Sequence, residues 1–255
     1  MSYDIPQIAV FVVIIGLSAA AQSAVGFGIA LFAMPPLLYV GLDLPSAIVV
    51  VAVASYMQSL LGVWRLRQAT PWRMAVIASA VSTLAVIAGF IILKRLTRLD
   101  LGLVKLTVGG ILCLLALSQM MTRPKAHARV HWTWAAGAFL TSGLLSGICG
   151  MGGPPLVLWS LAHDWTTAKT KGFLFAVSIV TIPIQLVLLR VMLARGIANP
   201  LLLGVALTPA TLLGAYLGLA LSQHMSKRVL RLCGYVMLLA IGVVAMIPPL
   251  LARLR

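Results

Sequence analysis

The hydrophobic positions of this chain fall into long stretches that contain no Asp, Glu, Lys or Arg. A helix that crosses a bilayer core about 30 Å thick needs about 20 apolar residues. Most of the stretches reach that length, which predicts an all-α polytopic membrane protein with about eight transmembrane helices. The eight stretches are residues 5–42, 44–64, 74–93, 106–122, 130–163, 172–189, 196–226 and 232–252.

Two of these stretches, 5–42 and 130–163, are too long for one straight crossing. As continuous helices they would measure roughly 50 to 57 Å at 1.5 Å per residue. Each contains a cluster of glycines followed by a pair of prolines, so we expect a helix, a glycine break and a short half-helix. The clusters are Gly26-Phe27-Gly28 with Pro35-Pro36, and Gly150-Met151-Gly152-Gly153 with Pro154-Pro155.

The order of long and short stretches occurs twice, with a period near 120 to 130 residues. This order predicts two homologous repeats, residues 1–122 and 132–255, joined by a basic linker at 123–131. Each repeat would hold a broken hairpin and three spanning helices. Because three crossings place the second repeat upside down relative to the first, we expect the inverted topology found in secondary transporters.

The composition supports a membrane protein over a soluble one. Hydrophobic residues make up 62% of the 255 positions and charged residues only 9%, with a mean hydropathy of +1.09. The 19 basic and four acidic residues lie between or beside the apolar stretches. Basic residues in short loops set the orientation of membrane proteins, so we expect a lipid bilayer as partner and no nucleic acid.

The two glycine breaks are candidate binding sites. Irregular backbone at membrane depth persists only where it is buried in protein or lines a wet cavity. Glycine permits the turns that a break requires, and proline fits the first turn of the half-helix that follows. Such a start presents free amides and the positive end of the helix dipole, which favour an anion. The alternative is that the glycines only let helices pack closely.

The sequences GFG followed by MPPLLY, and SGICGMGGPPLVLW at residues 146–159, resemble the paired signatures of the sulfite exporter TauE/SafE family, also called TSUP. The resemblance covers essentially the whole chain. It implies a multi-pass transporter of small sulfur-containing anions, such as sulfite or organosulfonates, in a bacterial inner membrane.

Candidate substrate-binding residues are the glycine breaks and the amide, hydroxyl and thiol side chains near them. Amides and hydroxyls suit the oxygens of a sulfonate, whereas the alternative for each is a hydrogen bond between or within helices. The candidates are Gln22, Ser23, Gly26, Phe27, Gly28, Tyr56, Gln58, Ser146, Cys149, Gly150, Met151, Gly152, Gly153, Ser178, Thr181 and Gln185.

The acidic residues suggest how transport would be driven. The chain has no Glu, and its four Asp lie at the ends of apolar stretches, which leaves no obvious carboxylate relay for protons. An anion leaving a cell that is negative inside gains about 2.3 kcal/mol per charge at 100 mV. We therefore favour export of the anion, held at half-helix N-termini near the midplane.

Two other functions remain open on sequence alone. An intramembrane acyl- or phosphotransferase could hold a phosphate on a Gly-rich loop, with bases drawn from the four histidines, but no nucleophile stands at a recognisable catalytic spacing. An anion channel is the other alternative. We expect no cofactor and no metal, and a homodimer stays open. The histidines are His127, His131, His163 and His224.

Overall fold

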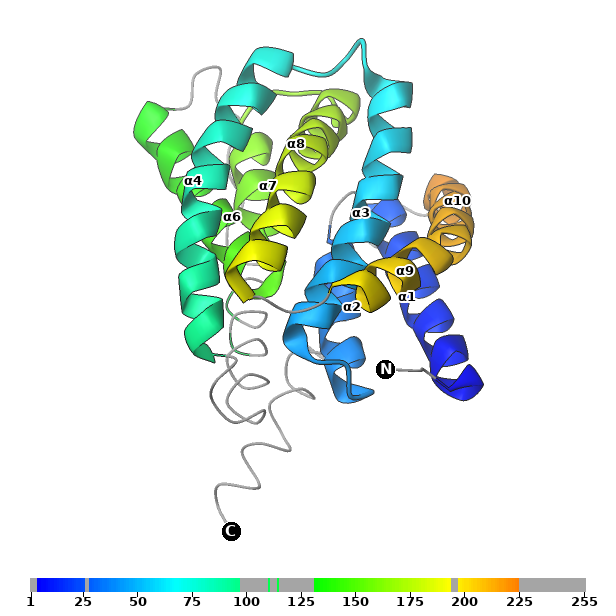
Figure 1. The fold of residues 1–255 in the computed structure, drawn as a ribbon. Coiled ribbons are helices and arrows are strands. Elements are labelled where there is room, and N and C mark those ends of the chain that lie inside the picture. The colour runs from blue at the N-terminus through cyan, green and yellow to red at the C-terminus, as the bar shows by residue number, and fades with distance from the viewer. Residues whose placement is uncertain are drawn as a thin grey trace. The chain divides into compact units, whose positions relative to one another are not determined.

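A computed structural model describes residues 4–25, 28–96, 131–193 and 197–224, together with residues 110 and 114 (Figure 1). Nearly all of these residues are helical. The helices are α1 (Ile5–Val25), α2 (Ile29–Tyr39), α3 (Leu44–Leu66), α4 (Trp72–Leu96), α6 (Trp132–Cys149), α7 (Gly153–Leu161), α8 (Thr167–Leu193), α9 (Ala198–Ala206) and α10 (Thr208–His224).

Four helices in the described part of the chain are long and apolar enough to cross a membrane by themselves. They confirm the prediction of an all-α polytopic membrane protein. The stretches predicted at 106–122 and 232–252 lie outside the described residues, apart from residues 110 and 114. The four candidate spans are Ile5–Ser23, Leu44–Leu66, Trp72–Arg95 and Thr167–Val191.

The stretch 196–226, predicted as a single crossing, contains a bend that the sequence analysis did not predict. It forms two helices, α9 and α10, that meet at Leu207 with a bend of 43°. Pro209 explains the position of the bend, because proline has no amide with which to continue the helical hydrogen bonds to the carbonyl four residues earlier.

Both long stretches are broken where the glycines predicted. The first hairpin has α1 ending at Val25 and α2 beginning at Ile29, and the second has α6 ending at Cys149 and α7 beginning at Gly153. The two half-helices differ in their prolines. Pro154 lies in the first turn of α7, where its missing amide costs nothing, whereas Pro35 and Pro36 lie inside α2.

The described helices belong to two compact units. The first contains α1, α2, the part of α3 up to Ala54, α9 and α10; the second contains α3 from Ser55, α4, α6, α7 and α8. Each unit therefore combines the broken hairpin of one predicted repeat with helices of the other. The boundaries of the repeats themselves stay a prediction.

In the first unit, α1 and α10 pack closely through small residues. A Cβ added at Gly214 would overlap the carbonyl oxygen of Gly16, and one at Gly218 would overlap that of Ala20. The two helices, blue and orange in Figure 1, lie side by side. Small residues allow this approach, as is common where helices associate in membranes.

In the second unit, α4 and α6 pack in the same way. A Cβ at Gly143 would overlap the Ser82 carbonyl oxygen, and one at Gly147 would lie 2.7 Å from the Cα of Gly89. The Ser82 hydroxyl also donates to the Phe139 carbonyl at 3.0 Å. These contacts fix α6, the helix that leads into the second break.

The two packed pairs have matching registers in the sequence. Gly143 and Gly147 follow Gly16 and Ala20 by 127 residues, and Gly218 follows Gly89 by 129. Such a correspondence is what the predicted repeats would produce, and the repeats themselves stay a prediction.

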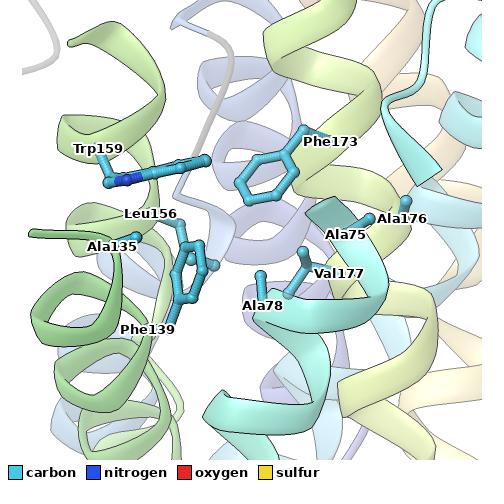
Figure 2. Close-up of a cluster of buried hydrophobic side chains, with 9 residues drawn as sticks. All are labelled: Ala75, Ala78, Ala135, Phe139, Leu156, Trp159, Phe173, Ala176 and Val177. Carbon is cyan, nitrogen blue, oxygen red and sulfur yellow. The ribbon is translucent and has the colours of Figure 1, made fainter. Parts of the chain in front are cut away.

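The core of the second unit is aromatic (Figure 2). Trp159 of α7 packs edge-on against Phe139 of α6, with ring centroids 4.9 Å apart, and lies 5.2 Å from the ring of Phe173 of α8. All three side chains are buried. The half-helix α7 is thereby anchored at its C-terminal part, which leaves its glycine-rich start at the break.

Candidate functional site

The second break begins with a left-handed cap on α6. Gly150 has φ 72°, a region that favours glycine. Its amide donates to the Ser146 carbonyl at 3.0 Å, and the Met151 amide donates to the Leu145 carbonyl at 3.4 Å. The last carbonyls of α6 are thus satisfied while the chain turns towards α7.

Gly152 is required for a different reason. Its φ of −75° is open to any residue, but an added Cβ would overlap the Ser146 hydroxyl oxygen and lie 2.6 Å from the Ser142 carbonyl oxygen. The buried Ser142 hydroxyl donates to the Gly152 carbonyl at 2.7 Å. The break is therefore held closely against α6, with no space for a side chain at this position.

The start of α7 carries hydrogen-bond donors that are not used inside the described part of the chain. The amides of Gly152 and Gly153 and the hydroxyl of Ser146 have no acceptor there. Pro154 and Pro155 contribute no amide. A Cβ at Gly153 would meet nothing within 4 Å, so the chain beside Gly153 faces open space, at the positive end of a helix dipole.

Gln185 of α8 braces this arrangement. Its Nε2 donates to the Ser146 carbonyl at 2.9 Å, which also accepts the Gly150 amide. The Gln185 side chain is buried, so this hydrogen bond fixes both the side-chain amide of Gln185 and the turn at Ser146–Gly150. Gln185 thus positions the backbone that bears the unused hydroxyl of Ser146.

The first break is built differently. Gly28 caps α2 with φ 98° and has no side chain with which to cap the helix. The amide of Ile29 instead donates to Oε1 of Gln22, at 2.7 Å across the break. Gln22 is only 8% exposed. A side chain from α1 therefore occupies the first amide of this half-helix.

The remaining predicted residues are less concentrated. Ser178 and Thr181 donate to the carbonyls of Leu174 and Val177 in their own helix, each at 2.9 Å, and Cys149 bonds to the Leu145 carbonyl. Gly26 and Phe27 lie outside the described residues. Ser23 and Tyr56 are half-buried, and Gln58 is buried.

The contacts bring the predicted residues into two groups. One consists of Gln22 and Gly28, and the other consists of Ser146, Gly150, Met151, Gly152, Gly153 and Gln185. Ser142, which fixes Gly152, was missed by the sequence analysis. Its position four residues before Ser146, on the same face of a helix, is the signal that could have identified it.

The histidines of the enzyme alternative do not assemble a reaction centre within the described ranges. His131 caps α6 through Thr133, and Nδ1 of His163 lies 3.0 Å from the Trp159 carbonyl. His127 and the side chain of His224 are not described. No group of three or more His, Cys or acidic residues that could hold a metal occurs among the described residues.

Comparison with known proteins identifies one family. A family model described as sulfite exporter TauE/SafE matches residues 10–245. The match includes both breaks and all the predicted site residues. No curated protein and no solved structure gives a significant match.

Proposed function

Because the chain belongs to the sulfite exporter TauE/SafE family, we propose that it exports sulfite or an organosulfonate across a bacterial inner membrane. Its family and its apolar helices make it a multi-pass membrane transporter of the sulfite-exporter type. The anion, the direction and the site are the parts that we propose here.

We place the main anion contact at the start of α7. The observation that carries this assignment is the set of unused donors: the amides of Gly152 and Gly153 and the hydroxyl of Ser146 have no acceptor among the described residues. Hydrogen bonds from such groups to an anion are stronger than those to neutral acceptors.

We propose that the membrane potential drives export. Among the described residues, no carboxylate bonds to the backbone of either break, so these donors would bind an anion without direct competition from an acidic side chain. Loss of a monovalent anion from a cell at −100 mV is favoured by about 2.3 kcal/mol. Export then needs no coupling ion.

Flux from proteoliposomes containing the purified chain tests the proposal. Efflux of sulfite, an organosulfonate, sulfate and thiosulfate is measured with the potential clamped by potassium and valinomycin. We expect saturable efflux of sulfite or the sulfonate that accelerates when the interior is negative. Flux that needs a proton or sodium gradient at a favourable clamped potential would contradict potential-driven export.

A matched pair of variants tests the site. Gly152→Leu fills the space beside Ser146, whereas Gly137→Leu adds the same side chain to the exposed part of α6, where a Cβ meets nothing within 4 Å. We expect transport to be lost only in Gly152→Leu. Normal transport by folded Gly152→Leu would show that the α7 start is not the site.

A further inference from the structure

We propose that one end of the second unit is a binding surface for the headgroup of an anionic phospholipid, such as phosphatidylglycerol. We call this surface the basic end and define it as residues 64–73 around the α3–α4 turn, 131–134 at the start of α6 and 163–171 at the start of α8. The second break lies at the opposite end of α6. The inference therefore does not rest on the proposed transport of sulfite.

One core cluster holds the three segments of the basic end together. Ala75 near the start of α4, Ala135 near the start of α6 and Phe173 near the start of α8 are all buried in the same aromatic cluster (Figure 2). Gly172 of α8 also lies against the α3–α4 turn, since an added Cβ would be 2.5 Å from the Thr70 hydroxyl oxygen. The three segments therefore form a single surface of the second unit.

The charge of the basic end is strongly positive. Arg67 and Arg73 are exposed on the two sides of the α3–α4 turn, and Lys169 lies in the first turn of α8, with its Nζ 5.0 Å from the centre of the Trp165 ring. Asp164 is the one acidic residue in the sequence of these segments. The basic residues are Arg65, Arg67, Arg73, Lys169 and Lys171. Such a cluster attracts an anionic lipid headgroup.

The tryptophans of the chain gather in the same three segments. Five of the six tryptophans in the sequence, all except Trp159, belong to the basic end. Trp64 and Trp132 are 68% and 56% exposed. Exposed tryptophan is typical of the headgroup level of a bilayer, because its ring is apolar and its indole N–H is polar. The basic residues of this end therefore lie at the depth of the lipid phosphates.

The α3–α4 turn presents its arginines from a fixed backbone. Nε1 of Trp72 donates to the Arg67 carbonyl at 3.2 Å, and the Thr70 hydroxyl donates to the Leu66 carbonyl at 2.9 Å. A backbone that is ordered before binding lowers the entropic cost of holding a ligand. Guanidinium groups suit a phosphate because their planar N–H groups can donate two parallel hydrogen bonds. A zwitterionic headgroup carries its own cation, so the basic end should prefer phosphatidylglycerol to phosphatidylcholine.

Native mass spectrometry of the full-length chain in detergent, titrated with each lipid, tests the proposal. A basic residue near an anionic lipid contributes about fivefold in affinity, so with two arginines we expect phosphatidylglycerol to bind about 25-fold more tightly than phosphatidylcholine. Arg67→Gln/Arg73→Gln should lose most of this preference and keep the wild-type melting temperature, because both side chains are exposed. Equal affinities of the wild type for the two lipids would overturn the proposal.

Lys94→Gln/Arg190→Gln is the matched control, because it removes the same charge from the opposite ends of α4 and α8. Lys94 follows Arg73 by 21 residues of one helix, which is roughly 30 Å at 1.5 Å per residue. That separation exceeds the Debye length of about 10 Å in 0.1 M salt, so the affinity for phosphatidylglycerol should stay within about twofold of wild type. A loss equal to that of Arg67→Gln/Arg73→Gln would show that net charge governs binding and would also overturn the proposal.

Glycerophosphoglycerol, the deacylated form of phosphatidylglycerol, distinguishes a lipid site from a site for soluble phosphate. It keeps the phosphodiester but has no acyl chains to contact the apolar sides of the helices. Burial of apolar chains contributes strongly to lipid binding, so the deacylated form should compete only at about 100-fold higher concentration than the lipid. Competition at equal concentrations would overturn the assignment of this surface to a lipid.

Discussion

The two glycine breaks perform the same topological step by different means. Gly28 is needed for its positive φ, and the half-helix behind it is capped by Gln22. Gly152 has an ordinary φ and is needed for space, while the α7 start keeps its donors unused within the described chain. Two similar glycine breaks can thus share a bend while the first amide of one half-helix is capped by a side chain and the start of the other keeps its donors unused among the described residues.

The largest expected effect comes from replacing each break glycine by asparagine, which distinguishes a requirement for positive φ from a requirement for space. Asparagine tolerates the left-handed region better than other residues with a side chain, so Gly28→Asn should lower the transport rate only about threefold. Gly152→Asn must displace the Ser142 carbonyl and the Ser146 hydroxyl. A displacement of about 1 Å at a binding site can cost about 100-fold in rate, and we expect a loss of that size in sulfite flux.

The same experiment has a built-in check at Gly150, which shares the positive φ of Gly28 but lies in the second break. Gly150→Asn should resemble Gly28→Asn rather than Gly152→Asn, because its requirement is conformational. If all three variants lost transport equally, the distinction between conformation and space would be wrong.

The two packed helix pairs, α1 with α10 and α4 with α6, should lose similar stability when a glycine at their contact is replaced by alanine. In this they differ from the two breaks, which should respond differently to the same substitution. Gly147→Ala places a methyl group against Gly89, and Gly218→Ala places one against the backbone of Ala20. Overpacking typically costs about 1 to 3 kcal/mol, so both variants should melt several degrees lower in detergent. Gly137→Ala, where the added methyl meets nothing within 4 Å, is the control. If Gly147→Ala lowered the melting temperature and Gly218→Ala did not, the two helix pairs would not depend on close packing in the same way.

The sequence was sufficient for the helical membrane fold and for both breaks, because apolar length and glycine clusters act locally. It did not predict the bend at Leu207, where a single proline was hidden in an otherwise continuous apolar stretch. It identified Gln22 and Gln185 as polar residues worth attention but not their roles. Those depend on which backbone group each amide reaches across a turn or between helices, and residue spacing does not specify that.

The smallest expected effect comes from removing the hydroxyl of Ser146. This change tests whether the unused donors at the second break bind the anion. Ser146→Ala removes a donor that has no acceptor among the described residues and leaves the carbonyl that Gln185 braces. A hydrogen bond contributes about 1 kcal/mol, so KM for sulfite should rise about fivefold with unchanged thermal stability.

Ser79→Ala is the matched control for this substitution, since the Ser79 hydroxyl is buried in α4 and donates to the Ala75 carbonyl of its own helix. It should leave KM at the wild-type value. Equal KM values in Ser146→Ala and wild type would mean that the unused hydroxyl does not contact the anion. The unused donors of the second break would then be the amides of Gly152 and Gly153 alone, among the described residues.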